Sequence, residues 1–282
     1  MSSSDPPAGA TRWRLDLAYD GREFSGFAPQ PGRVTVAGEL ADAIARTLRL
    51  DAPPTIVGAG RTDRGVHALG QVVHVDLPAT LYRDDRAPTG ARLVAALNGQ
   101  LAGRVRVLGA APAGAGFDAR FSATWRAYRY LVLEATPPAL ELTSAWSWAV
   151  PAPLDLDAMN RAGAAALGTH DFRAFCRRRD GSSPDEPIVR EVLDVVWERR
   201  RDEWTLAPGG ADVVRLWIRA VSFCHHMVRS LVSTMVAVGQ GRLDPSIVEE
   251  RLAAPHRDGL PAPAPAHGLA LVSVGYPEAP VP

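Results

Sequence analysis

The sequence of 282 residues contains no lysine: all 31 basic residues are arginine, and 31 acidic residues balance them to a formal net charge of zero. A neutral chain argues against a protein that coats nucleic acid without selectivity, because such coating depends on excess positive charge. Arginine nevertheless suits RNA contact, since its guanidinium group can fork onto a phosphate and stack on a base. A GC-rich coding bias that also favours Ala, Pro and Gly explains the missing lysine equally well, so composition leaves the partner open.

Cysteine and long apolar segments are also scarce. Cys176 and Cys224 are 48 positions apart and form neither a disulfide framework nor a zinc pattern, so we expect two free thiols.

The longest apolar segment, residues 231–238, is far shorter than the roughly 18 residues of a membrane span, and no membrane contact is expected. Residues 1–10 show no basic region followed by an apolar one, so we expect a cytoplasmic protein.

Hydrophobic periodicity predicts an alternation of strands and helices in the first half of the chain. Strands are expected at 13–19, 55–57, 71–75 and 104–110, and helices at 36–50 and 92–97. Thr35 is the expected N-cap of the first helix. The order strand, helix, strand, strand, helix, strand is typical of a ferredoxin-like domain.

The second half repeats this scheme loosely. Strands are expected at 123–134, 146–150, 189–199, 213–221 and 269–274, and helices at 156–167, 223–239 and 245–253. The fold class is therefore α+β, with two halves that carry antiparallel sheets. We expect a flexible tail over 1–11, an N-terminal α+β domain over 12–112 and a C-terminal α+β domain over 113–282.

The loop predicted at 58–70 carries the densest chemical signal. In the sequence Gly-Ala-Gly-Arg-Thr-Asp-Arg-Gly-Val-His, Asp63 stands between Arg61 and Arg64. Nearby positive charge favours the ionised carboxylate, and an ionised carboxylate aimed at carbon can form a covalent intermediate. Thr-Asp-x-Gly is also ordinary turn chemistry, which is the more common use of such an aspartate. The residues alone leave both interpretations open.

Arg229 interrupts the pattern of the helix predicted at 223–239. Phe223, Met227, Leu231 and Met235 form an apolar stripe at four-residue spacing, and Arg229 falls off it. A solvated helix face is the ordinary explanation, and an arginine that orients a carboxylate is the alternative.

The histidines predict no metal site. His225 and His226 are adjacent, so on a helix they would point to different sides. His67 and His74 have no set of Cys, Asp or Glu at ligand spacing. We read all four as structural or as contacts to RNA.

Five motifs, taken together, resemble one known family. Residues 60–68 (Gly-Arg-Thr-Asp-Arg-Gly-Val-His-Ala) are similar to the active-site motif of the tRNA pseudouridine synthase A family. The other four also stand in the family's order along the chain: Tyr19-Asp20-Gly21 with Phe24, Gly26 and Gln30 before this motif, and Gly70 to His74, Phe117 to Tyr130, and His225 to Arg229 with the later Gly268-Leu269 after it. The resemblance covers roughly 250 residues.

The resemblance implies a fold and an activity. The fold would be two ferredoxin-like halves that share a continuous, mostly antiparallel sheet around a basic cleft. The protein would be a homodimer that isomerises uridine to pseudouridine in the anticodon stem-loop of tRNA, at positions 38 to 40. No cofactor and no metal are implied.

The resemblance also assigns roles to residues. Asp63 would be the nucleophile, Tyr128 would lie against the target uracil, and Arg229 would pair with Asp63. Arg61 would contact the RNA backbone or help hold the flipped nucleotide. Beyond the resemblance, we expect Arg64, His67 and His226 to contribute to substrate binding. Whether the carboxylate attacks C6 of the ring or C1′ of the sugar is open.

Tyr128 has a structural alternative. It shares one face of its strand with Tyr130, so either tyrosine could fill the core of the sheet. We expect Tyr130 to lie in the core and Tyr128 to meet the base.

Three departures and two rival functions accompany the resemblance. Arg64 replaces a small residue, and the segment 27–30 (Phe-Ala-Pro-Gln) stands where a Trp-Gln pair is common. The segment 184–190 only loosely resembles the family's Arg-rich stretch, with Arg190 as its best remnant. All three departures bear on the choice of tRNA site. The rivals are a noncatalytic RNA-binding module and a hydrolase of the glycosidic bond, although the hydrolase lacks an evident second carboxylate.

Overall fold

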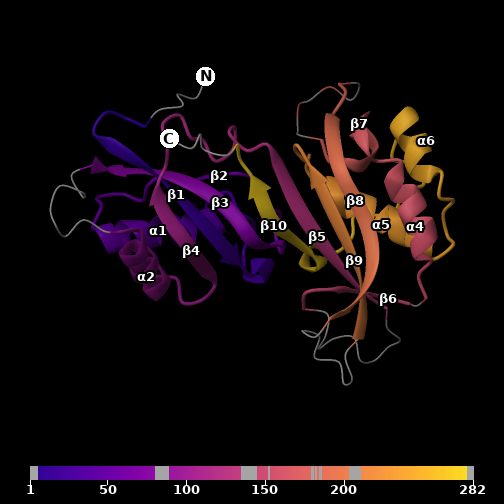
Figure 1. Cartoon of the computed structure of the whole chain (residues 1–282), viewed down its shortest axis with the longest axis horizontal. Helices are drawn as coiled ribbons and strands as arrows, with labels where there is room; N and C mark the ends of the chain where they lie inside the picture. The colour runs from indigo at the N-terminus through magenta and orange to yellow at the C-terminus, as the bar shows by residue number, and fades with distance from the viewer. Residues whose placement is uncertain are drawn as a thin grey trace. The chain divides into compact units, whose positions relative to one another are not determined.

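The computed structural model describes residues 6–79, 89–134, 145–151, 153–178, 181, 183, 186–202 and 211–277 (Figure 1). The chain forms two compact units, Met1–Thr124 with Leu271–Pro282, and Trp125–Ala270. Residues 113–124 belong to the first unit, because Phe117 and Ala119 pack with Ala59 and Val72 of that unit. Among the described residues, none of the helices combines the length and the apolar character that crossing a membrane requires.

The first unit has the element order expected from the sequence (Figure 1). The elements are β1 (Ala10–Tyr19), α1 (Val36–Leu48), β2 (Val57–Gly58), β3 (His67–Pro78), α2 (Gly90–Gln100) and β4 (Val105–Pro112). The strands pair in the order β4-β1-β3, with β2 beside β3, and all of these pairs are antiparallel. This is the connectivity of the split βαβ unit.

Alternation along β1 sets its central place in this unit. Trp13, Leu15 and Leu17 are buried on one face, as the period of two predicts. Leu15 pairs with Val73 of β3 on one side and with Ala110 of β4 on the other. Because β1 is paired with a strand on each side, its last residue, Tyr19, is held in a fixed position.

Helix α1 begins and ends as local chemistry dictates. The Thr35 hydroxyl accepts a hydrogen bond from the Gly38 amide, so the predicted N-cap is confirmed. The helix ends at Arg49, which adopts left-handed backbone angles (φ 53°). That conformation closes a helix end.

The second unit contains strands and helices in a similar order (Figure 1). They are β5 (Trp125–Glu134), β6 (Trp148–Val150), α4 (Leu156–Ala164), β7 (Gly168–Asp171), β8 (Val189–Asp202), β9 (Ala211–Ala220), α5 (Met227–Gly239), α6 (Ile247–Ala253) and β10 (Leu269–Gly275). The chain leaves this unit within β10. The strand order here is β5-β9-β8-β7, and β6 lies parallel to β5.

The expected α+β class is confirmed, because the described strands form a ten-stranded, mostly antiparallel sheet. Several expected bounds shift by a few residues, and β3 begins at His67, inside the loop predicted at 58–70. Two further expectations differ from the structure. Strand β7 was not predicted, since its four residues, Gly-Thr-His-Asp, have no hydrophobic alternation. Helix α5 begins at Met227 rather than near 223, because His226 has left-handed backbone angles (φ 67°) that a helix does not allow.

The two cysteines correct a further expectation. The prediction of two free thiols was wrong: Cys176 and Cys224 form a disulfide with their Cα atoms 5.9 Å apart. The bridge joins the segment after the short 3-10 helix η3 (Arg173–Phe175) to the segment before α5. Beside it, the Arg177 amide donates to the His225 carbonyl oxygen at 2.8 Å.

Candidate active site

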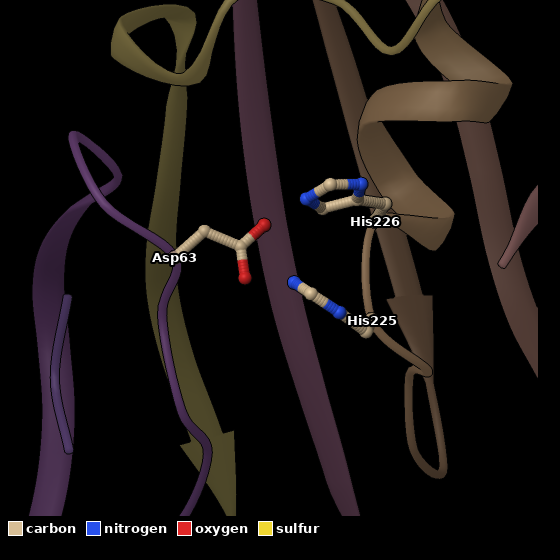
Figure 2. A group of neighbouring side chains, drawn as sticks. All are labelled: Asp63, His225 and His226. Carbon is tan, nitrogen blue, oxygen red and sulfur yellow. The ribbon is translucent and has the colours of Figure 1, made fainter. Parts of the chain in front are cut away.

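Asp63 lies in the loop that joins β2 to β3, and its carboxylate extends away from the loop backbone (Figure 2). The loop turns sharply here, because the Val66 amide donates to the Asp63 carbonyl oxygen at 3.1 Å. Gly65 has a φ of 81°, which favours glycine at this position. The expected turn is therefore present, and it is formed by the backbone around Asp63. A half-buried carboxylate at such a turn combines a fixed main chain with an accessible side chain.

The neighbour of Asp63 anchors the loop to the sheet. Thr62 is buried, and its hydroxyl lies 2.8 Å from the hydroxyl of Tyr19 at the end of β1. The side-chain amide of Gln71, on β3, donates both to the Tyr19 hydroxyl (3.3 Å) and to the Gly60 carbonyl oxygen (2.8 Å). These hydrogen bonds connect the loop residues that precede Asp63 to the two strands β1 and β3.

Sequence reasoning missed this buried network, although Tyr19 and Gln71 stand within the motifs that resemble the family. The signal that could have found it is alternation along paired strands, which places polar side chains on the same face. Burial raises the pKa of Tyr19 to about 12, while its hydrogen bonds to Thr62 and Gln71 act in the opposite direction. The phenol therefore stays protonated at neutral pH.

Two glycines let a second segment pack closely against the loop. A Cβ atom on Gly21 would lie 2.0 Å from the Val66 carbonyl oxygen, and one on Gly26 would lie 3.1 Å from the Thr62 carbonyl oxygen. The Phe27 amide donates to the same Thr62 oxygen at 3.0 Å. The motif around residues 19–30 therefore braces the loop from its other side.

The other candidate residues near Asp63, two in the loop and His67 at the start of β3, differ in their exposure. Arg61 and Arg64 are exposed, so both guanidinium groups are accessible to a polyanion. His67 is 1% exposed, and its Nδ1 atom lies 3.2 Å from the Gly21 amide and 3.2 Å from an Asp20 carboxylate oxygen. The position of His67 suits it to hold the residue 20–21 turn, and gives no support to the expected contact with substrate.

In the second unit, Tyr128 and Tyr130 lie on β5. Tyr128 is 7% exposed and packs edge-on against Phe223, with ring centroids 5.1 Å apart. Tyr130 is completely buried, and its hydroxyl donates to the Pro265 carbonyl oxygen at 2.8 Å, so its predicted core position is confirmed. Burial raises the pKa of Tyr130, and the charge of Arg229 opposes this effect.

Arg229 lies in the first turn of α5 and is half-buried. Its Nε atom donates to the Ala264 carbonyl oxygen at 2.7 Å, and the Ala264 amide donates to the Arg229 carbonyl oxygen at 3.0 Å. The interpretation of a solvated helix face is wrong, because Ser230 and Ser233 are both only 2% exposed. The hydrogen bonds to Ala264 therefore hold the charged group of Arg229 in a defined position.

His225 and His226 occupy the turn immediately before α5 (Figure 2). Their ring centroids are 4.1 Å apart, so the expectation that they point to different sides is wrong. The reason is the left-handed backbone of His226, which places both residues outside the helix. His226 and Arg229 line one pocket of about 560 Å³.

Comparison with known proteins identifies the family. A family profile described as tRNA pseudouridine synthase matches residues 162–277. A protein from Frankia casuarinae is 47% identical over 96% of this chain and 92% of its own length. Proteins from Cutibacterium acnes (44% identical over 95% of this chain and 89% of their own length) and Streptomyces griseus (42% over 98% and 92%) are similarly close.

The chain belongs to the tRNA pseudouridine synthases, which are isomerases. The three relatives are each named tRNA pseudouridine synthase A. The resemblance found in the motifs is therefore confirmed.

Proposed function

We propose that the protein converts uridine to pseudouridine in the anticodon stem-loop of tRNA, at positions 38 to 40, with Asp63 as the nucleophile. The observation that carries the proposal is the placement of Asp63: a half-buried carboxylate on a turn whose neighbour Thr62 is anchored to Tyr19. Catalysis by a carboxylate depends on such positioning, because the reacting atoms must be held about 3 to 3.5 Å apart.

The chemistry requires one nucleophile and one proton transfer. The N1–C1′ bond breaks, the uracil rotates, and a C5–C1′ bond forms. The proton on C5 is then lost and N1 gains a proton, so no atoms are added or removed overall. Attack of the carboxylate at C6 of the base or at C1′ of the sugar would each detach the base, and the Asp63 ester would break again as the product forms.

Further residues of both units have proposed roles in binding the RNA. A uracil in a helical stem must be flipped out, at a cost of a few kcal/mol. Stacking on an aromatic ring returns about 1–3 kcal/mol, and Tyr128 is the proposed surface. Arg229 is the proposed partner of the Asp63 carboxylate in the complex with tRNA. His226, Arg61 and Arg64 are the proposed contacts to the RNA.

The setting of the reaction is also part of the proposal. We expect a homodimer in the cytoplasm, where tRNA is found. Size-exclusion chromatography with light scattering checks the dimer. A monomer at micromolar concentration would contradict it without affecting the chemistry of Asp63.

Release of tritium tests the reaction. With tRNA labelled at C5 of uridine, the wild-type protein should release tritium in step with pseudouridine formation, without free uracil. Asp63→Asn removes the nucleophile and should abolish release, whereas Asp51→Asn, at an exposed aspartate of the same unit, should leave it unchanged. Free uracil would identify a hydrolase instead. Binding of tRNA without any release would identify a noncatalytic RNA-binding module.

Substitutions in the tRNA test the site. A tRNA in which cytidine replaces uridine at positions 38 to 40 should release no tritium, while uridines elsewhere stay unmodified. Modification outside this region would contradict the anticodon stem-loop assignment but not the formation of pseudouridine.

A conservative substitution tests Tyr128. Tyr128→Phe keeps the ring and should bind tRNA about as well as the wild-type protein. A large loss of binding would show that the hydroxyl group itself contacts the tRNA.

A further inference from the structure

The pocket at the start of α5 carries an unusual concentration of positive charge. Its lining includes the side chains of six basic residues: Arg173, Arg177, Arg178, His226, Arg229 and Arg257. None of the described residues that line it has a carboxylate, although the whole chain contains equal numbers of basic and acidic residues. The charge is therefore gathered here by the fold.

Three segments that are distant in sequence form the walls, and covalent and hydrogen bonds connect them. The Cys176–Cys224 disulfide joins the segment of Arg173 to Arg178 to the turn before α5. Arg229 and Ala264 exchange two hydrogen bonds, which connect α5 to the segment that follows α6. The walls are therefore fixed before any ligand arrives, which lowers the entropic cost of binding.

Within the part of the chain that the structure describes, two of the arginines are held by uncharged acceptors. Arg178 donates to the backbone carbonyl oxygens of Ser183 and Glu186, and Arg257 donates to the Ser230 hydroxyl at 3.5 Å. These acceptors are uncharged, so they orient the guanidinium groups without neutralising them. Arg173 differs, since it is paired with Asp171 at 2.6 Å.

We propose that this pocket binds a phosphate group of the RNA backbone together with its ribose, and that Arg177 and Arg257 are the principal contacts. This inference rests on the proposed function for its choice of RNA. Guanidinium groups recognise phosphate oxygens with paired hydrogen bonds. The volume of about 560 Å³ exceeds what a phosphate alone requires and leaves room for the attached sugar.

The position at the helix terminus adds to this attraction. His226 is the N-cap residue of α5 and lines the pocket, so the pocket lies at the positive end of a 13-residue helix. The arginines supply full charges, and the helix terminus supplies a smaller contribution of the same sign.

A pair of substitutions tests the pocket. Arg177 and Arg257 are exposed, so Arg177→Gln with Arg257→Gln should leave the fold intact, which the melting temperature checks. The Kd for tRNA should rise about tenfold or more. The slope of log K against log salt should become less steep by roughly 0.7 to 0.9 for each phosphate that the variant no longer neutralises. The matched control is Arg242→Gln, beyond the other end of the same helix, which should change neither quantity.

Two further measurements distinguish RNA binding at this pocket from the chemical reaction. With saturating tRNA, the double variant should form pseudouridine at nearly the wild-type single-turnover rate. Inorganic phosphate should weaken tRNA binding by the wild-type protein more than binding by the double variant. A double variant with the wild-type Kd and salt dependence would overturn the pocket assignment. An effect on phosphate competition without any effect on RNA affinity would also overturn it, because the site would then take free phosphate only.

Failure of the reaction gives a different result. A wild-type protein that forms no pseudouridine, while the double variant still loses tRNA affinity, would contradict the proposed function and leave the phosphate site standing.

Discussion

The hydroxyl group of Tyr19 lies 2.8 Å from the hydroxyl group of Thr62, and both side chains are buried. Tyr19 ends β1 and Thr62 precedes Asp63, so this hydrogen bond connects the sheet to the residue next to the proposed nucleophile. Gln71 adds a second bond to the Tyr19 hydroxyl from β3. The loop position is therefore set by groups that do not touch the reacting atoms.

The first prediction concerns Thr62. Thr62→Val removes the hydroxyl while keeping the shape, so the Tyr19 phenol loses a partner in a buried site. We expect the free energy of unfolding to fall by about 1 to 3 kcal/mol and kcat to fall by about tenfold or more, because a small displacement of a catalytic group is costly. KM should change little. Steady-state tritium release and urea unfolding measure these quantities.

Thr62→Ser is the matched control, because serine restores the hydroxyl. Its kcat should return to near the wild-type value. If Thr62→Ser loses as much kcat as Thr62→Val, a hydroxyl at this position is not sufficient, and the assignment of the effect to the hydrogen bond is contradicted.

The second prediction concerns pH and Tyr19. Burial raises the pKa of this phenol from 10.0 to about 12. The folded state therefore keeps its proton at a pH where the unfolded state has lost it. The stabilising contribution is fully present below pH 10 and is lost as the pH rises toward 12, by about 3 kcal/mol in total. Guanidinium unfolding at pH 9.5 and at pH 11.5 measures the loss.

Tyr19→Phe removes the titrating group and should lower the dependence on alkaline pH. Tyr130 also has a raised pKa, so the variant should keep part of the dependence. Identical alkaline slopes for Tyr19→Phe and the wild-type protein would contradict the assignment to Tyr19.

Local signals in the sequence predicted the elements whose ends are set by neighbouring residues. Helix α1 begins where Thr35 caps it, because the capping bond spans only three residues. The apolar stripe of α5 was equally clear, yet the helix begins four residues later than predicted. The left-handed backbone at His226 interrupts it, and periodicity carries no information on that angle.

Features that depend on long-range pairing could not be predicted. Cys176 and Cys224 meet through the path of the chain in the second unit, and their spacing alone gave the opposite expectation. The identity of Asp63 as a candidate came from residue type and motif. The Tyr19–Thr62 bond that braces it joins residues 43 positions apart, and the β1–β3 register shifts between Leu17 and Tyr19; no local pattern reveals either feature.

The third prediction compares two glycines. In Gly21→Ala, the new methyl group would meet the Val66 carbonyl oxygen at 2.0 Å, and backbone cannot move aside as a flexible side chain can. We expect a loss of more than about 2 kcal/mol in the free energy of unfolding and a fall in activity, since Val66 follows the Asp63 turn. Chemical denaturation and tritium release measure both effects.

Gly99→Ala is the contrasting variant. Gly99 lies in α2, where an added Cβ atom meets nothing within 4 Å. Alanine should stabilise the protein by about 0.4 to 1 kcal/mol, because it restricts the unfolded chain. A stabilised Gly21→Ala would mean that the residue 21 turn does not pack on Val66.

The fourth prediction concerns the disulfide. A bridge that closes 48 residues restricts the unfolded chain by about 4 kcal/mol in the loop-entropy model. Reduction should therefore lower the midpoint of urea unfolding substantially. Protein purified and denatured without reductant should show no titratable thiol, and reduced protein should show two. The double variant Cys176→Ala with Cys224→Ala should unfold at the midpoint of the reduced wild-type protein and should not respond to reductant.

The variant without the two cysteines should also bind tRNA more weakly. Cys176 lines the pocket at the start of α5, and the bridge holds Arg177 beside the turn before that helix. Without the bridge the pocket loses a covalent tie, so we expect weaker tRNA binding, whereas the Asp63 loop of the first unit keeps its own hydrogen bonds to Tyr19 and Gln71. The Kd should rise while the single-turnover rate at saturating tRNA stays within about twofold. A loss of rate with unchanged Kd would place the effect of the bridge on the chemical step and contradict this division of roles.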